Sequence, residues 1–310
     1  MQSQPLLGAI EGGGTKMVCA VGFSDGRIIK RESFPTALPE GTLPKLVRFF
    51  QNEGVTALGI GSFGPVDLRE DSPTYGYITS TPKLTWIDTP FMPVLRDALN
   101  VPVGFETDVN MAAIGEHTLG AGRGLSNIVY VTVGTGIGAG IIVDGKPLHG
   151  LVHPEMGHLL LRPGVGETHP DGFCPYHKGC LEGLACGPAI EQRWGKAARD
   201  LPPEHPAWEL ESDYLAQMCA NLIFALSPER IILGGGVMHQ AQLFDPIRRK
   251  TVNLLGGYVR SSRILADTAE YIVPPGLGDQ SGIVGGLMLA DRALQRFGSS
   301  SAENRKAHIS

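Results

Sequence analysis

One local pattern occurs twice in the chain, about 120 residues apart, and it restricts the fold to a duplicated one. In each copy an apolar segment leads into a glycine-rich turn, and a second apolar segment is followed by an Asp-Gly pair. Gly14-Thr15 aligns with Gly134-Thr135. At nearly the same offset, Asp25-Gly26 falls one residue from Asp144-Gly145. Two turn signals at one offset predict a repeated strand–turn–strand–turn–strand unit.

Strands alternate with helices along the rest of the chain, which is typical of an α/β protein with two lobes. We expect strands at 57–60, 101–105 and 230–233, and helices at 43–53, 91–99, 108–119, 188–199, 211–226 and 279–296. Residues 1–119 form the predicted N-terminal lobe, completed by the C-terminal helix at about 279–297. Residues 120–278 form the C-terminal lobe with a loop at about 150–187, and 298–310 a flexible tail.

Glycine is the most unusual part of the composition, at 42 of 310 residues, about 14% against an average of roughly 7%. Clusters at 12–14, 134–138 and 234–236 each follow a predicted strand. Backbone without Cβ atoms lets phosphate oxygens approach the amide groups, and Thr15, Thr135 and Lys16 add polar groups. Because strands follow the first two clusters, a Rossmann dinucleotide site is disfavoured. We predict phosphate-binding hairpins, with plain tight hairpins as the alternative.

Charge and hydropathy exclude several classes of protein. The net charge is −5, which gives no general attraction to nucleic acid or to an anionic membrane. No apolar run reaches the roughly 18 residues that a membrane span needs. The segment Met1–Pro5 does not resemble the start of a signal peptide. We therefore expect a cytoplasmic protein without nucleic-acid or membrane partners, whose five cysteines are reduced or bind metal.

Cys174, His177 and Cys180 form a C-x2-H-x2-C motif in the predicted loop. Two thiolates and an imidazole suit tetrahedral zinc, which needs a fourth ligand from elsewhere. His158 is the best candidate, with His169 and His153 as alternatives. The competing interpretation is that the three residues are reduced cysteines and a histidine without metal.

Asp108 follows the predicted strand at 101–105 and opens the predicted helix. A carboxylate at this position could act as a general base. A carboxylate at a helix start is also a common N-cap. The residues alone favour the N-cap role.

The ordered set of motifs in this chain resembles the sugar-kinase, actin and Hsp70 ATPase superfamily. Within it, the chain is similar to the ROK group of sugar kinases, and most of all to the fructokinase branch. The motifs are the Cys/His motif together with Ile10–Lys16, Gly59–Asp67, Glu106–Asn110, Val133–Gly138, His153–His158 and Leu233–Gly236. The resemblance spans about residues 8–290. It implies a duplicated ribonuclease-H-like (actin/hexokinase-type) α/β fold with two lobes and an interlobe cleft, and a homodimer.

The resemblance also assigns roles to residues of this chain, with ATP, Mg²⁺ and structural Zn²⁺ as cofactors and a hexose as substrate. Asp108 matches the catalytic aspartate. The expected sugar-binding residues are Gly64, Asp67, Thr107, Asp108, Glu155, His158 and Glu182. The expected nucleotide-binding residues are Gly12, Gly13, Gly14, Thr15, Lys16, Gly134, Thr135, Gly136, Gly187, Pro188, Gly234, Gly235 and Gly236. The expected zinc ligands are His158, Cys174, His177 and Cys180.

Two positions depart from the glucokinase-like pattern. Glu11 stands where an aspartate often precedes the phosphate loop, and Thr107 replaces an asparagine. Both resemble the fructokinase branch, so we expect ATP-dependent phosphorylation of D-fructose to fructose 6-phosphate. A mannokinase, glucokinase or other hexose kinase is the alternative. A sugar-sensing regulator is less favoured because only eleven residues precede Gly12, and an ATPase without sugar chemistry because of the Cys/His motif.

Overall fold

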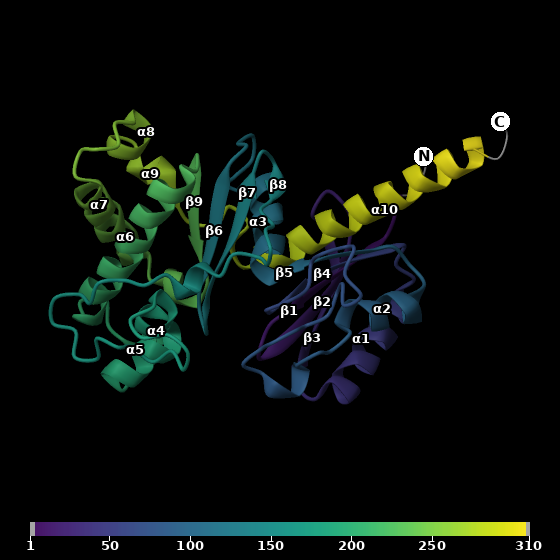
Figure 1. Cartoon of the computed structure of the whole chain (residues 1–310), viewed down its shortest axis with the longest axis horizontal. Coiled ribbons are helices and arrows are strands. Elements are labelled where there is room, and N and C mark those ends of the chain that lie inside the picture. Colours follow the sequence, from purple (N-terminus) through teal and green to yellow (C-terminus); the bar gives the residue numbers. More distant parts are fainter. Residues whose placement is uncertain (1–3, 308–310) are drawn as a thin grey trace. The chain divides into compact units, whose positions relative to one another are not determined.

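The computed structural model describes residues 4–307, with side chains for 4–299, and divides into two compact units (Figure 1). Unit 1 contains the chain up to Gly120, the segment Pro147–His153 and the chain from Gln280 onward. Unit 2 contains Ala121–Lys146 and Pro154–Asp279. No pattern in the sequence marks the segment 147–153 as separate from the residues around it. The lobe boundaries drawn from the sequence stay a prediction.

Unit 1 contains a five-stranded sheet in the order β3-β2-β1-β4-β5. The strands are β1 (Leu7–Gly12), β2 (Lys16–Gly22), β3 (Ile28–Pro35), β4 (Ala57–Ser62) and β5 (Val103–Thr107). β1, β2 and β3 are antiparallel neighbours, whereas β4 and β5 run parallel to β1. Gly12 pairs with Ser62, and Ser62 pairs with Thr107. The three parallel strands therefore end side by side at one edge of the sheet.

Helices cover both faces of this sheet (Figure 1). They are α1 (Pro39–Glu53), α2 (Phe91–Leu99), α3 (Asp108–Thr118) and α10 (Ser281–Ala307). Gly8 lies against Phe50 of α1, whereas Ala9 lies against Gly286 of α10. Since successive strand residues point to opposite faces, α1 and α10 lie on opposite sides. The α1 side holds the main apolar core of the unit, around Ile10, Phe50 and similar side chains.

Glycines allow α3 to pack directly on α10. A Cβ atom at Gly285 would lie 1.7 Å from the carbonyl oxygen of Met111, and one at Gly115 would lie 2.4 Å from that of Ser281. Neither position can hold a larger residue without moving the helices. This contact fixes α3, and with it the position of Asp108 at the helix start.

Unit 2 repeats the topology of unit 1. Its strands are β6 (Ile128–Val133), β7 (Ile137–Val143), β8 (Lys146–Pro147), β9 (Arg230–Gly234) and β10 (Ile272–Val273). The order β8-β7-β6-β9-β10 matches β3-β2-β1-β4-β5 strand for strand. β6 is antiparallel to β7 and parallel to β9, which is parallel to β10. The duplication and the α/β class predicted from the sequence are confirmed.

The helices of unit 2 are α4 (Leu181–Ala185), α5 (Gly187–Trp194), α6 (Ala207–Leu226), α7 (Phe244–Leu255), α8 (Ser262–Leu265) and α9 (Thr268–Tyr271). Short 3₁₀ turns, in both units, are η1 (Leu84–Trp86), η2 (Met156–His158), η3 (Ala198–Asp200), η4 (Gly236–His239), η5 (Ala241–Leu243) and η6 (Gly278–Gln280). Within residues 4–307, none of the helices combines the length and the apolarity that crossing a bilayer requires.

A buried ion pair ties the loop of unit 2 to its helices. Arg193 of α5 pairs with Glu167 at 3.0 Å, and the Tyr214 hydroxyl of α6 donates to the same carboxylate at 2.6 Å. Burial alone would raise the pKa of Glu167, but these hydrogen bonds and the guanidinium hold it below its usual value.

Three helix boundaries differ from those predicted. α1 begins at Pro39 rather than at the predicted residue 43. α5 ends at Trp194, because Gly195 adopts the left-handed conformation that stops a helix. α10 continues past Gly298 to Ala307. A single glycine costs a helix only about 1 kcal/mol relative to alanine, which is too little to end it.

Candidate active site and metal centre

One edge of the unit 1 sheet carries the first group of predicted site residues. Because Gly12, Ser62 and Thr107 are aligned, the segments after them begin at adjacent strand ends. Strands lie 4.7–4.9 Å apart, so the glycine turn and Asp108 begin roughly 10 Å from each other. Ligands of open α/β sheets bind at this kind of edge, outside the carboxyl ends of parallel strands.

The first glycine turn is closed by one backbone hydrogen bond and leaves two amide groups without a protein acceptor. Gly13 N donates to Lys16 O at 2.9 Å, which closes the turn. The carbonyl oxygens of Gly13 and Gly14 accept hydrogen bonds from Thr36 Oγ1 at 2.7 Å and Lys83 Nζ at 3.0 Å. The N–H groups of Gly14 and Thr15 have no acceptor among the described residues. Adjacent backbone amides without a protein acceptor are donors of the kind that bind an anion.

Asp108 is the first residue of α3, and the N-cap is Thr107. The Thr107 hydroxyl accepts from Asn110 N at 3.1 Å, whereas Asp108 Oδ1 accepts from Val109 N at 2.9 Å. The prediction that Asp108 serves as the N-cap is therefore wrong. Asp108 is half-buried and lies at the positive end of the helix dipole of α3.

A buried carboxylate stabilises the corner from which Asp108 projects. Glu106 accepts from Asn110 Nδ2 at 2.9 Å and pairs with His149 Nε2 at 2.8 Å. Its hydrogen bond to Glu106 raises the pKa of His149, although burial opposes this. Glu106 and Asn110 belong to a motif seen in the sequence, but no sequence signal pointed to His149.

Gly64 and Asp67 lie in the loop after β4. The His153 ring packs on Gly64 and its Nε2 accepts from Val66 N at 3.1 Å. The Asp67 carboxylate accepts from Ser72 Oγ at 2.5 Å and Thr74 Oγ1 at 2.7 Å. Burial would raise the pKa of Asp67, but these hydrogen bonds outweigh it and lower the pKa. Asp67 thus organises its own loop in this structure.

The second and third glycine turns meet at the matching edge of the unit 2 sheet. Gly234 is the last residue of β9, which pairs with β6, and Gly187 N donates to Gly134 O at 2.7 Å. Gly235 has a φ of +89°, and a Cβ there would lie 2.5 Å from Val133 O. Gly134, Thr135, Gly136, Gly187, Pro188, Gly234, Gly235 and Gly236 therefore lie around the ends of β6 and β9 and the start of α5.

Two carboxylates lie beside the second glycine turn. Glu182 Oε2 accepts from Ile137 N at 2.8 Å, and a Cβ at Gly136 would come within 2.7 Å of the same oxygen. Desolvation and the carboxylate of Glu182 raise the pKa of Glu155. Glu182 therefore supports the second glycine turn.

His158, Cys174, His177 and Cys180 form one cluster whose ligand atoms all lie within 4.8 Å of one another. His158 Nδ1 lies 3.7 Å from Cys180 Sγ and 4.0 Å from Cys174 Sγ, which lies 3.7 Å from His177 Nδ1. The His169 ring instead contacts Thr168 Oγ1 at 3.0 Å. Of the three candidate fourth ligands, His158 is the one that joins the cluster.

The donor set fits zinc. Zinc bonds of about 2.3 Å to sulfur and 2.0–2.1 Å to nitrogen place tetrahedral sulfur and nitrogen ligands about 3.6 Å apart. The three sulfur–nitrogen distances of 3.7, 3.7 and 4.0 Å are close to that value. Burial raises the pKa of the Cys180 thiol to about 11, so a bound cation is what would keep it as a thiolate.

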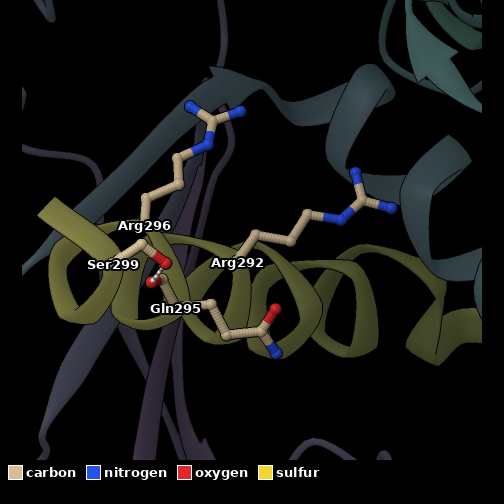
Figure 2. Close-up of a pocket in the computed structure, with 4 residues that line it drawn as sticks. All are labelled: Arg292, Gln295, Arg296 and Ser299. Carbon is tan, nitrogen blue, oxygen red and sulfur yellow. Dashed lines mark hydrogen bonds between the residues drawn. The ribbon is translucent and has the colours of Figure 1, made fainter. Parts of the chain in front are cut away.

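A cavity of about 500 Å³ lies elsewhere on unit 1, lined by Arg292, Gln295, Arg296 and Ser299 of α10 (Figure 2). Arg292 and Arg296 extend from the same side of the helix in this view. Arg296 also reaches Glu70 at 3.4 Å. This cavity contains none of the residues predicted for sugar, nucleotide or metal.

The duplicated sheet, with glycine turns at matching strand ends and a carboxylate at a helix start, defines a two-unit α/β protein of the actin/hexokinase type. The ROK family profile matches residues 7–293. The chain belongs to the ROK family.

Relatives and solved structures agree with this assignment. The fructokinase of Pediococcus pentosaceus is 47% identical over 290 residues, covering 94% of this chain and 99% of that protein. The fructokinase of Zymomonas mobilis subsp. mobilis (strain ATCC 31821 / ZM4 / CP4) is 45% identical, covering 92% and 96%. The crystal structure of a ROK family glucokinase from Streptomyces griseus, in complex with glucose and AMPPNP, is 27% identical with a TM-score of 0.73, covering 94% and 99%.

Proposed function

We propose that the chain is an ATP-dependent fructokinase, which transfers the γ-phosphoryl group of ATP to the 6-hydroxyl of D-fructose. One observation carries the proposal: a carboxylate at a helix start and a glycine turn with free amides lie at one sheet edge. The relatives named fructokinase at 45–47% identity favour fructose over another hexose. A hexose kinase with another preference is the second candidate.

Asp108 is the proposed general base. In the transfer, the sugar oxygen forms a bond to the γ-phosphorus while the bond to the leaving ADP oxygen breaks, and the hydroxyl proton passes to the Asp108 carboxylate. The fixed α3 helix start holds this carboxylate in one position. When bound with the nucleotide, Mg²⁺ would neutralise charge on its phosphates.

Three glycines in the turns are evidence for a nucleotide site. Gly14 and Gly236 have nothing within 4 Å of an added Cβ atom, and Gly134 has only Gly236 N at 3.9 Å. None of the three has a positive φ. Neither packing nor backbone conformation therefore requires glycine there, whereas close approach of a phosphate would. The other proposed nucleotide-binding residues are Gly12, Gly13, Thr15, Lys16, Thr135, Gly136, Gly187, Pro188, Gly234 and Gly235.

Alanine substitutions separate these two kinds of glycine. We expect Gly14→Ala to leave thermal stability unchanged or to raise it by about 0.4–1 kcal/mol, while the KM for ATP rises several-fold. We expect Gly136→Ala to lower stability because its Cβ would clash with Glu182. Melting temperature and initial rates at varied ATP concentrations measure both. An unchanged KM for ATP in a stable Gly14→Ala enzyme would count against the nucleotide site.

The proposed sugar-binding residues are Gly64, Asp67, Thr107, Asp108, Glu155, His158 and Glu182. Carboxylate oxygens can accept from neighbouring sugar hydroxyls. His158 directs Nδ1 toward the cysteines, which leaves Nε2 for a sugar hydroxyl. Thr107 lacks the two-sided hydrogen bonding of an amide, which disfavours glucose.

Zinc at the His158, Cys174, His177 and Cys180 cluster is proposed as structural, because four protein ligands leave no open position. It would hold together the loop that carries Glu155 and the start of α4 with Glu182. We also propose that the protein is cytoplasmic and forms a homodimer.

A panel of hexoses tests the proposed function. Purified protein with ATP and Mg²⁺ is expected to phosphorylate D-fructose with a higher kcat/KM than mannose or glucose, measured by a coupled ADP-release assay. Higher turnover of mannose or glucose would favour the second candidate. ATP hydrolysis that no sugar changes would refute a sugar kinase of either kind.

A further inference from the structure

The side chain of Lys83 reaches the first glycine turn from a distant part of the chain. Its ammonium donates to Gly14 O at 3.0 Å. We propose that Lys83 is a phosphate-binding residue that contacts the terminal phosphates of the nucleotide. This inference rests on the proposed function, since it assigns a ligand group to the same site.

The backbone at Lys83 is held in place by a buried tryptophan three residues later. Trp86 is fully buried, and its Nε1 donates to Ala37 O at 2.8 Å. Its ring packs edge-on against those of Phe63 and Phe91, with centroids 5.8 Å away in each case. Trp86 N also donates to Lys83 O at 2.8 Å, so the backbone of Lys83, the N-cap of η1, is fixed by the buried Trp86.

The Lys83 ammonium still has hydrogen-bond donors available for an anion. A lysine ammonium has three donors, and Gly14 O takes one of them. Within residues 4–299, no carboxylate forms an ion pair with Lys83. A positive charge thus lies beside the unpaired amides of Gly14 and Thr15, next to a glycine that has open space around it.

This combination points to a multiply charged phosphate. Two backbone amides and an ammonium are the donor types that hold the terminal phosphates of a nucleotide. A sugar hydroxyl would not need the charge, and an adenine ring would not need the amides. Lys16 lies on the same turn and is exposed, but no described hydrogen bond fixes its side chain. Lys83 is therefore the lysine that the structure has already positioned.

Nucleotide binding without sugar tests the proposal. Lys83→Met is expected to weaken AMP-PNP binding about 10- to 100-fold, the usual effect of one charge-assisted hydrogen bond, while AMP binding changes less than about twofold. Lys83→Arg should recover most of the AMP-PNP affinity, since it keeps the charge. Lys45→Met, at an exposed lysine of α1, is the matched control and should behave as wild type. Titration calorimetry measures all four proteins.

The outcomes distinguish phosphate binding by Lys83 from a purely structural role at the glycine turn. Unchanged AMP-PNP affinity in Lys83→Met overturns the proposal, and so does an equal loss for AMP and AMP-PNP, which would mean that Lys83 only braces the turn. A melting temperature for each variant checks that it is folded. Fructose turnover by the wild type is scored separately. Its absence would refute the fructokinase function while the binding comparison still decides the role of Lys83.

Discussion

Asp108→Asn is expected to lower kcat by about 10²–10⁴-fold, the usual contribution of a positioned general base, and to leave both KM values nearly unchanged. Asparagine has almost the same shape and can still accept from Val109 N through its carbonyl oxygen. It cannot take up the proton of the sugar hydroxyl. Steady-state kinetics with varied fructose and varied ATP measure the effect.

Stability separates this loss from misfolding. Thr107 is the N-cap, so the substitution removes a charge near the helix start and no capping bond, at a cost of about 0.3–1 kcal/mol. Asp245→Asn is the matched control, because Asp245 is an exposed carboxylate in the first turn of α7. Both variants should lose a similar small amount of stability, and only Asp108→Asn should lose turnover. Near-normal kcat in folded Asp108→Asn would remove Asp108 from the mechanism.

The duplicated core of the fold was predictable because its signals are local. Apolar runs, glycine turns and Asp-Gly pairs lie within a few residues of one another, and the structure confirms the repeat in both sheets. The edge strands β8 (Lys146–Pro147) and β10 (Ile272–Val273) were not predictable, since two residues carry no periodicity. Only pairing with a neighbouring strand makes them strands. The continuation of α10 past Gly298 was also not predictable, since a single glycine does not show whether a helix ends there.

The candidate site was predictable where one short motif contains it. Within the Cys/His motif and within each glycine turn, residues that are neighbours in the sequence are also neighbours in space. The site is also supported by residues that are distant in the sequence. Thr36 lies 23 residues from its partner Gly13, Lys83 lies 69 from Gly14, and His149 lies 43 from Glu106. No local sequence pattern marks such contacts. The N-cap of α3 is Thr107 rather than Asp108. The two assignments differ by one residue in the helix start, and sequence patterns do not resolve helix ends that finely.

Cys180→Ser is expected to abolish zinc binding and to lower the melting temperature by about 10 °C, the shift that a loss of about 4 kcal/mol causes in a domain of this size. Cys180 is also the N-cap of α4, where its sulfur accepts from Gly183 N at 3.4 Å. Serine is a better N-cap than cysteine. If capping were its only role, the substitution would be neutral or stabilising.

Cys186→Ser is the matched control, because Cys186 is the N-cap of the next helix, α5, and is likewise buried, but does not belong to the metal cluster. The chemical change and the N-cap position are the same in both variants. Cys180 also accepts a capping bond from Gly183 N, which Cys186 lacks, but serine can keep that bond, so metal binding is the main difference between them. Metal analysis should find one zinc per chain in wild type and Cys186→Ser and none in Cys180→Ser. A chelator should then destabilise wild type and Cys186→Ser and leave Cys180→Ser unchanged. Equal melting temperatures and equal zinc contents in both serine variants would show that the cluster holds no structural metal.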